Sequence, residues 1–546
     1  MSLLQDIPIL SIILGTPLLG LIVVLLLPKS RSNWLKAAAI ITTLIPMVLS
    51  IWLYSDYDSM RGGDAYGEEV DWLQLPLNHD VISDADSSFV LQYSLGVDGL
   101  TLPLLLLTAI VTAMAALAAT HIKKRWKSFF VWFLLLEFGM LGAFLARDLF
   151  LFFLFFEITL VATYFLIGIW GYFNRERAAN MFLLYNGIGS ALMLIAFVML
   201  ANTAGFHIDQ SGATATFIYS GSYSDIMRNL TDSGAWVNVL PTAIGNVNPF
   251  YMSDGMQWSI FVLLLIAFGI KLPLFPFHTW MLGVHKEAPP SVVMIHSGIL
   301  LKLGAYGLLR FGLLLFPEQA RDSATALAVL GVVNVLYGAV LAFRQQDFKL
   351  VLAYSSVSHM GIVMIGLAAM NEIGLQGAVF QLVSHGLISA LLFLIVGSLY
   401  ERTKTTELGE LGGLSRSMPF MSGVLLVGGL ASLGLPGLSG FIGEVLAFLG
   451  LFETMKAVTV IAIAGIVLAA AYVLRSVLKI TFGPQKESFS SFKDVRFIEA
   501  LPMIILLAFI ILLGCYPSVL TDTVQFSVGG FMDQLFAGGG GGLNHG

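Results

Sequence analysis

Six ionisable residues lie within long apolar stretches of this chain, where a charged side chain is costly. Glu157 stands in LFFLFFEITLVATYFLIGIW, and Lys271 and Lys302 stand in LLIAFGIKLPLF and SGILLKLGAYG. A lysine or aspartate at the centre of a membrane helix costs about 2.5–3.5 kcal/mol on insertion scales, so such residues usually face a bundle interior or a water-filled path. Acids and bases spread over several helices at this depth are typical of a proton relay. The six candidate relay residues are Glu157, Lys271, Lys302, His359, His385 and Glu444.

Each of these residues also has a simpler interpretation when it is taken alone. A lysine and a glutamate can form an ion pair that only fixes helix packing, and a single buried histidine such as His359 or His385 is more often a hydrogen-bonded core residue. The whole set favours the relay, because one ion pair needs two partners and not six groups on six predicted spans. We interpret His278 and His285, which are seven residues apart, as lining or structural residues. Arg310 is expected near the outer end of its span, where a long side chain can reach the water interface.

The elements that carry these residues must be membrane-spanning helices. Hydrophobic residues make up 57% of the 546 residues and charged residues only 11%, whereas a soluble domain has about 25% charged residues. Spanning segments must satisfy their own backbone polar groups, and the apolar runs lack the period-two alternation of strands. The sequence therefore predicts an all-α polytopic membrane protein with about 14 spans, at 8–27, 35–54, 96–119, 128–145, 149–170, 178–203, 257–281, 291–315, 324–343, 351–369, 375–399, 418–450, 457–480 and 497–516.

The distribution of basic residues predicts how the helices are oriented. About 20 of the 28 Lys and Arg residues lie in alternate loops, and cytoplasmic loops carry the excess of basic residues in membrane proteins. Both termini are therefore expected on the outer side, together with the long polar loops 55–95 and 204–256. The first residues include no basic region before the apolar run, so no cleavable signal peptide is expected.

Proline and glycine interrupt two of the predicted spans. KLPLFPFHTW places Pro273 and Pro276 directly after Lys271, and ASLGLPGLSGFIGE places Pro436 before Glu444. Proline removes a helical hydrogen bond, and non-helical backbone at membrane depth is tolerated only inside protein or beside a water-filled cavity. Two ordinary proline kinks are the alternative, which the ionisable residue beside each break argues against.

The two breaks are about five spans apart. Interrupted helices in corresponding halves are typical of transporters that are built from inverted repeats. The sequence predicts two inverted five-helix repeats, each with one proline-broken helix. The expected regions are helices 1–3 with an acidic outer loop (1–120), the first repeat (121–316), the second repeat (317–483) and a last helix with a Gly-rich tail (484–546).

Redox chemistry is not expected in this chain. Cys515 is its single cysteine, which excludes an internal disulfide and a cysteine-ligated cluster. The sequence has no Rossmann-type glycine motif and no evident haem ligation, and no histidine pair among the relay candidates is spaced for a metal site. We therefore expect no bound cofactor or metal, and no nucleic-acid partner.

Four stretches carry a family resemblance. KLPLFPFHTWMLGVHKEAPPSVVMIHSGILLKLGAYGLLRF resembles the core signature of the antiporter-like subunits of respiratory complex I. FFEITLVATYFLIGIWG, AYSSVSHMGIVMIGL and ASLGLPGLSGFIGE resemble the other landmarks of that family in the same order, and the likeness extends from LGVDGLTLPLLLLT onward. Glu444 favours the subunit M type of NADH-quinone oxidoreductase, because the L and N types and the related cation/proton antiporter subunits usually have a lysine there. A long C-terminal extension with a lateral helix, as in the L type, is not expected either.

The resemblance implies a role for each relay candidate. Many relatives have an acid in W-L-P-D-A-H where this chain has WMLGVH (280–285) followed by Lys286 and Glu287, so a proton-uptake role is not carried over to this loop. The corresponding family positions are an ion pair for Glu157 and Lys271, a central lysine for Lys302, the polar axis for His359 and His385, and the terminal acid near the outward exit for Glu444.

The resemblance also implies a function and a setting. If Glu157 approaches Lys271 the lysine keeps its proton, and if the carboxylate withdraws the proton can pass to Lys302 and on toward Glu444. The expected function is proton translocation in a complex I-like NADH-quinone oxidoreductase of the cell inner membrane, beside L and N type subunits. NADH, FMN, iron–sulfur clusters and quinone are expected in partner subunits. The alternatives are a subunit of a multisubunit sodium/proton antiporter or of a membrane-bound hydrogenase-type pump, and a structural spacer would need no such row.

Overall fold

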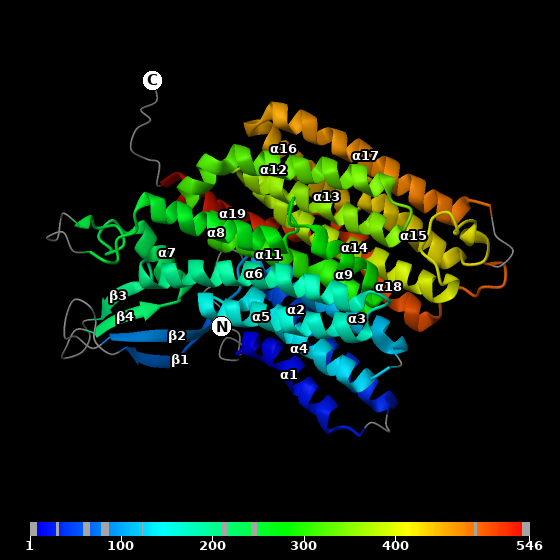
Figure 1. The fold of residues 1–546 in the computed structure, drawn as a ribbon, viewed down its shortest axis with the longest axis horizontal. Coiled ribbons are helices and arrows are strands. Elements are labelled where there is room, and N and C mark those ends of the chain that lie inside the picture. Colours follow the sequence, from blue (N-terminus) through cyan, green and yellow to red (C-terminus); the bar gives the residue numbers. More distant parts are fainter. Residues whose placement is uncertain are drawn as a thin grey trace.

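The computed structural model confirms a polytopic helical protein (Figure 1). It describes residues 8–28, 32–57, 66–77, 87–122, 124–209, 216–241, 248–484 and 489–537. Within these ranges, 13 helices are long and apolar enough to cross a membrane. They are α1 (Ile9–Leu26), α2 (Ser32–Asp56), α3 (Thr101–Ala118), α4 (Trp126–Leu145), α5 (Leu149–Trp170), α6 (Arg175–Asn202), α8 (Asp254–Lys271), the run Pro290–Leu313, α12 (Pro317–Arg344), α13 (Phe348–Ala368), α14 (Glu372–Thr403), α17 (Lys456–Phe482) and α18 (Phe497–Cys515).

The remaining predicted span, 418–450, is two separate helices in the structure, and two other stretches of the chain depart from a regular α-helix. The predicted span 418–450 is divided into α15 (Pro419–Ser432) and α16 (Ser439–Thr454), and α8 is followed after a gap by α9 (Thr279–Glu287). The run Pro290–Leu313 contains two π-helical turns, which occur frequently at functional sites. Its parts are α10 (Pro290–Ile295), η5 (His296–Leu300), α11 (Leu301–Gly307) and η6 (Leu308–Leu313); two short 3₁₀ turns elsewhere are η3 (Ala119–His121) and η7 (Leu414–Arg416).

The helices differ strongly in how deeply they are buried. The most apolar windows of Pro290–Leu313 and α14 are 100% buried, and those of α3 and α13 are 89% buried, against 28% for α2 and 33% for α1 and α17. The outer helices therefore leave much of their surface uncovered by this chain, and the central ones do not. Three of the central elements carry Lys302, His359 and His385.

Packing follows the same order in two parts of the bundle. Helix α4 packs on α5, α5 on α6 and α6 on α8, while α12 packs on α13, α13 on α14 and α14 on α16. Five is an odd number of crossings, so the two sets must run in opposite directions through a membrane. This order supports the predicted pair of inverted repeats, whose exact limits stay a prediction.

A four-stranded sheet projects from one end of the bundle beside α7 (Tyr223–Thr231), and the sequence patterns did not predict it (Figure 1). Its strand order is β1-β2-β4-β3, with a parallel pair β2–β4 between two antiparallel pairs. The central pair joins segments that are more than 100 residues apart, and local periodicity cannot reveal such pairing. The strands are β1 (Glu68–Leu77), β2 (Ser87–Leu95), β3 (Phe206–Asp209) and β4 (Thr216–Ser220).

A buried ion cluster joins the segment that follows β2 to the bundle. Arg310 donates to Asp98 Oδ2, Arg147 Nη2 lies 3.3 Å from the same oxygen, and the Arg310 guanidinium lies 5.0 Å from the centroid of the Tyr223 ring. Arg310 does not reach the water interface as predicted, because its side chain is buried in this pair. Burial alone would raise the pKa of the Asp98 carboxyl, but Arg310 and Arg147 outweigh it and hold that pKa below its usual range.

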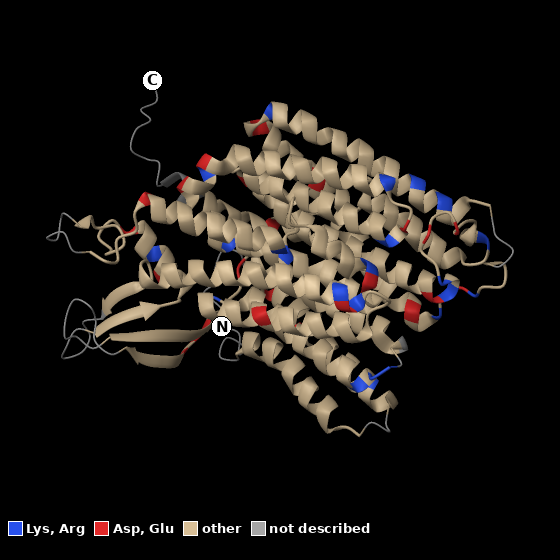
Figure 2. Ribbon diagram, viewed as in Figure 1, with Lys and Arg blue, Asp and Glu red and all other residues tan. Residues whose placement is uncertain are grey.

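Basic residues gather at the end of the bundle opposite the sheet (Figure 2). The loops at that end connect α3 to α4, α5 to α6, α9 to α10, α12 to α13, α14 to α15 and α17 to α18. We call this the basic end and the other the sheet end. The two ends have the charge asymmetry on which the predicted orientation rests.

The last described helix, α19 (Ser518–Ala537), was not predicted as a separate element. It follows α18 after a short turn, and Ser527 Oγ accepts a hydrogen bond from Gly99 N at 2.9 Å. Its polar residues, such as Asp522, keep its hydropathy below that of the spans. The expected Gly-rich tail lies outside the described residues from position 538 onward.

We expect Asp98→Asn to lower the free energy of unfolding by about 3–5 kcal/mol, because the variant leaves Arg310 buried without its counter-charge. Asp225→Asn, which breaks the exposed pair with Arg228 in α7, is the matched control and should cost less than about 1 kcal/mol. Thermal unfolding of the purified protein in mild detergent measures both. Equal losses for the two variants would contradict the assignment.

The same pair predicts a pH dependence. The native pKa of Asp98 lies below the unfolded value of about 3.9, so its contribution is complete above that pH and is lost as pH falls toward the native pKa. The difference between the wild type and Asp98→Asn should therefore stay constant from about pH 8 to pH 5 and shrink only below about pH 4. A difference that already shrinks near neutral pH would show that the pair is not ionised as described.

Candidate functional site

The first two relay candidates lie near each other without touching. Lys271 is the last residue of α8 and is almost fully buried, with Nζ 4.7 Å from the centroid of the Phe156 ring and 5.4 Å from that of Phe182. Glu157, on α5, is within electrostatic range of Lys271. Among the described residues, neither Lys271 Nζ nor Glu157 Oε1 has a hydrogen-bond partner. A lysine that is held only by aromatic rings and a distant carboxylate is sensitive to any movement of that carboxylate.

A pair of histidines bridges the space after Lys271. His285 Nε2 and His296 Nδ1 are 3.0 Å apart, and both side chains are fully buried. The Phe182 ring, which contacts Lys271, lies 5.9 Å from the His296 ring. Both Lys271 and Lys302 act electrostatically on His296. His296 therefore lies between the two lysines, where the sequence reasoning placed no residue.

His296 could have been found in the sequence. It precedes Lys302 by six residues in MIHSGILLK, inside a predicted span. It is as isolated among apolar residues as His359 and His385, which the sequence predicts as relay residues. The sequence predicts a lining or structural role for His285, and in the structure this residue lies against His296. His278 is buried against the rings of Phe275 and Tyr337 and has no hydrogen-bond partner among the described residues.

The central lysine contacts the next histidine directly. Lys302 Nζ lies 2.8 Å from His385 Nδ1 and donates to the Ser297 carbonyl oxygen in the π-helical turn. The His385 and His359 rings follow with centroids 5.2 Å apart. A small cavity lies beside His385 and is lined in part by Ser355, Ser356, Ser389 and Ser432. The space open to the centre of a water molecule is about 10 Å³, which is room for roughly one water.

One ring nitrogen of His359 lies near both a hydrogen-bond donor and a hydrogen-bond acceptor. Its Nδ1 lies 3.2 Å from Gln381 Nε2 and 3.5 Å from Glu444 Oε1. An amide nitrogen only donates and needs an acceptor at Nδ1, whereas an ionised carboxylate needs a donor there. A neutral ring cannot serve both, so the proton on Nδ1 decides which neighbour is bonded. The arrangement is suited to passing a proton between the ring and Glu444.

The first break is held by a helix from the other repeat. Phe275 N donates to Asn334 Oδ1 at 2.7 Å, and Asn334 Nδ2 donates to Pro273 O at 3.3 Å. Asn334 is a fully buried residue of α12. Trp280 Nε1 satisfies one more freed carbonyl, that of Ile270, at 3.1 Å. Pro273 and Pro276 both lie in this non-helical segment, directly after Lys271.

The second break brings its acid against bare backbone. Pro436 lies between Gly434 and Gly437, whose φ angles of +78° and +90° only glycine adopts readily. A Cβ on Gly434 would lie 2.5 Å from Glu444 Oε2, so the carboxylate packs on the break itself. From α18, a Cβ on Gly514 would lie 2.4 Å from Gly437 O. Each break is thus braced by the helix two spans further along, α12 for the first and α18 for the second.

One buried acid lies outside this row. Glu137 on α4 is fully buried, and neither of its carboxylate oxygens has a hydrogen-bond partner among the described residues. Neither Lys271 nor Lys302 acts electrostatically on Glu137. In the described part of the chain, no group of three or more His, Cys, Asp or Glu residues could hold a metal ion.

Together, these contacts form one row from α5 to α16, which is buried except at Glu157, where the residue is only half-buried. Contacts between 2.8 and 3.5 Å link Lys302 to His385 and His359 to Glu444, and ring contacts link Lys271 to His296. Glu157 is the member that is joined only by electrostatics. Chemically, the row can accept, hold and release protons.

The same fold and sequence pattern occur in known membrane complexes. Residues 146–469 match the family model described as NADH:quinone oxidoreductase/Mrp antiporter, TM. NADH-quinone oxidoreductase subunit M of Rhodobacter capsulatus is 35% identical over 92% of this chain and 91% of its own length. The subunit M of Rickettsia prowazekii (strain Madrid E) is 35% identical over 96% of this chain and 98% of its own length.

Solved structures agree with these relatives. A chain of respiratory complex I from Thermus thermophilus with bound NADH superposes with a TM-score of 0.80 and 28% identity, over 96% of this chain and 99% of its own. A chain of the Mrp complex from Dietzia sp. DQ12-45-1b has a TM-score of 0.78 at 18% identity, over 97% and 98% of the two chains, and shares the fold. The protein therefore belongs to the NADH:quinone oxidoreductase/Mrp antiporter membrane family, as a homologue of complex I subunit M.

Proposed function

We propose that this chain translocates protons as a membrane subunit of an NADH-quinone oxidoreductase. The observation that carries the proposal is the buried row from Lys271 to Glu444, in which Lys302, His359 and His385 lie on the most enclosed helices of the bundle. The row has two ends, each beside a helix break, and the proposal requires water to reach the row there. A merely structural role would require neither the row nor the breaks.

The proposed cycle begins at the gap between Glu157 and Lys271. Approach of the carboxylate stabilises the protonated lysine, and withdrawal, driven by charge movement in a neighbouring subunit, favours proton release to His296 and Lys302. His385, His359 and Glu444 then carry the proton onward. Moving one charge across 100 mV costs about 2.3 kcal/mol, and each tenfold change in proton affinity corresponds to about 1.36 kcal/mol. A hundred- to thousandfold change in the proton affinity of Lys271 is therefore the required scale.

The proposal extends to orientation and partners. The basic end would face the cytoplasm by the positive-inside rule, and the sheet end with both termini would face outward from the inner membrane. Antiporter-like subunits of the L and N types would lie beside this chain. NADH, FMN, iron–sulfur clusters and quinone would belong to partner subunits, from which the energy would arrive along the membrane.

A subunit of a multisubunit cation/proton antiporter is the second candidate, favoured by the shared fold of the Mrp chain. Purification of the assembled complex from native membranes, followed by mass spectrometry of its subunits, separates the two. Iron–sulfur subunits and a quinone-site subunit should accompany this chain. Small hydrophobic antiporter subunits without redox partners would overturn the assignment.

Glu157→Gln should reduce proton translocation at least about tenfold while the complex still assembles, because the variant keeps the shape but cannot present a negative charge to Lys271. The assay is acidification of proteoliposomes driven by NADH oxidation with an added quinone as electron acceptor, with assembly judged by native gel electrophoresis. Glu137→Gln is the control, because it makes the same change at a buried glutamate on the adjacent helix outside the row. Normal pumping by Glu157→Gln would refute the switch.

Lys302→Arg should also abolish most proton translocation, although it preserves the positive charge. A guanidinium does not give up its proton in proteins, so the central step to His385 would stop. Lys479→Arg, at the basic end of α17, makes the same change away from the row and should pump normally. If Lys302→Arg pumped like the wild type, Lys302 would act only as a fixed charge and not as a carrier.

A further inference from the structure

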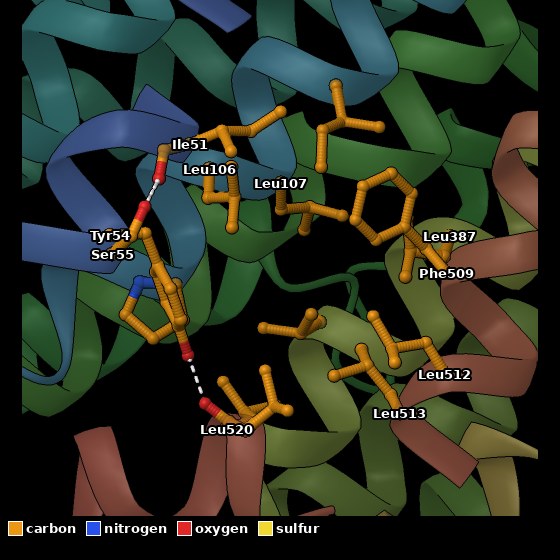
Figure 3. A pocket seen from close by; sticks show the side chains of 14 residues that line it. Ile51, Tyr54, Ser55, Leu106, Leu107, Leu387, Phe509, Leu512, Leu513 and Leu520 are labelled. Carbon is orange, nitrogen blue, oxygen red and sulfur yellow. Dashed lines mark hydrogen bonds between the residues drawn. The ribbon is translucent and has the colours of Figure 1, made fainter. Parts of the chain in front are cut away.

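An apolar pocket opens between five helices and is lined by none of the relay residues, although one of these helices, α14, also carries His385 (Figure 3). Its walls come from α2, α3, α14, α18 and α19, with Leu106, Leu387 and Leu512 among the side chains that point into it. The volume is about 190 Å³ for water centres. An apolar cavity of roughly 150 Å³ stays dry and takes up a hydrocarbon as large as benzene. The pocket is therefore large enough for a stretch of hydrocarbon.

The lining leaves no polar group free to bind a ligand inside the pocket. Its two hydroxyl side chains lie on α2 and are already bonded: Tyr54 donates to Val519 O at 2.5 Å, and Ser55 donates to Ile51 O at 2.7 Å (Figure 3). The pocket runs along α3 from Pro103 to Ile110, which is about 10 Å at 1.5 Å per residue. An occupant must therefore be elongated and purely apolar in this region. An acyl chain of a membrane lipid has that shape and chemistry, and four of the five walls are spanning helices.

The charges at one end of the pocket indicate the kind of lipid. Tyr54 and Ser55 lie at the end of α2, next to the exposed Asp56, and Leu520 is followed by the exposed Asp522 on α19. Asp522 acts electrostatically on Tyr54, and Asp56 accepts a hydrogen bond from Tyr66 at 2.7 Å. The lining contains no Lys or Arg among the described residues. Two carboxylates that have no basic partner among the described residues attract an ammonium headgroup and repel an anionic one.

We propose that this pocket binds one acyl chain of a phospholipid with an ammonium headgroup, held at the sheet end between α2 and α19. The lipid would fill the space that separates the N-terminal helices α2 and α3 from α18, and its headgroup would lie beside Asp56 and Asp522. The proposal does not depend on proton translocation, because none of the relay residues lines the pocket.

The test uses the assembled complex, reconstituted in vesicles that contain phosphatidylethanolamine with a photoactivatable diazirine on its acyl chain. After irradiation, peptide mass spectrometry should find the label on segments 103–110 and 509–520. Phosphatidylglycerol with the same acyl chain, at equal mole fraction, should label these segments at least about threefold less. Leu106→Trp and Leu512→Trp, which fill the pocket from two different helices, should each lower the labelling several-fold.

Leu184→Trp on α6 is the control, because it makes the same change at an exposed position of a spanning helix outside the pocket. Its labelling and assembly should equal those of the wild type, and assembly of the other variants is checked against it. Labelling that persists in both pocket-filling variants would overturn the lipid site. Equal or stronger labelling by phosphatidylglycerol would overturn the headgroup assignment, and a partner-subunit peptide found in the pocket would replace the lipid as its occupant.

Discussion

The low dielectric of the membrane interior is the constraint on which the rest of this structure depends. A charge or an unpaired backbone group at that depth must find its partners inside the protein. The chain meets this requirement by enclosing its ionisable groups in helices that other helices surround completely, such as α14 and the run Pro290–Leu313. The outer helices shield this polar axis from lipid. Their apolar surfaces are as necessary to the site as the lysines and histidines within it.

The two helix breaks join the fold to the chemistry. Each break exposes backbone polar groups next to an ionisable residue, Lys271 at the end of α8 and Glu444 against the turn at Gly434. Each is also held by the helix two spans further along, through the Asn334 hydrogen bonds in one case and the close approach of Gly514 in the other. Movement of either break would therefore be felt by α12 or α18, which pack on α13 and α14, the helices that carry His359 and His385.

The same fold occurs in membrane protein complexes whose names indicate different sources of energy. A chain of the archaeal membrane-bound sulfane sulfur reductase has a TM-score of 0.78 at 24% identity, over 94% of this chain and 77% of its own, close to the score of the Mrp chain. These likenesses concern the fold alone.

The sequence by itself determined the number and order of the spans, the two proline breaks and most of the buried ionisable groups, because hydropathy and charge act on each segment separately. Only the tertiary structure decided which residues and segments contact each other. It brought β2 next to β4, paired Arg310 with Asp98, inserted His296 between the two lysines and set Asn334 across the first break. It also left Glu157 without a direct bond to Lys271. These contacts join segments far apart in the chain, and local periodicity carries no information about which distant surfaces will pack together.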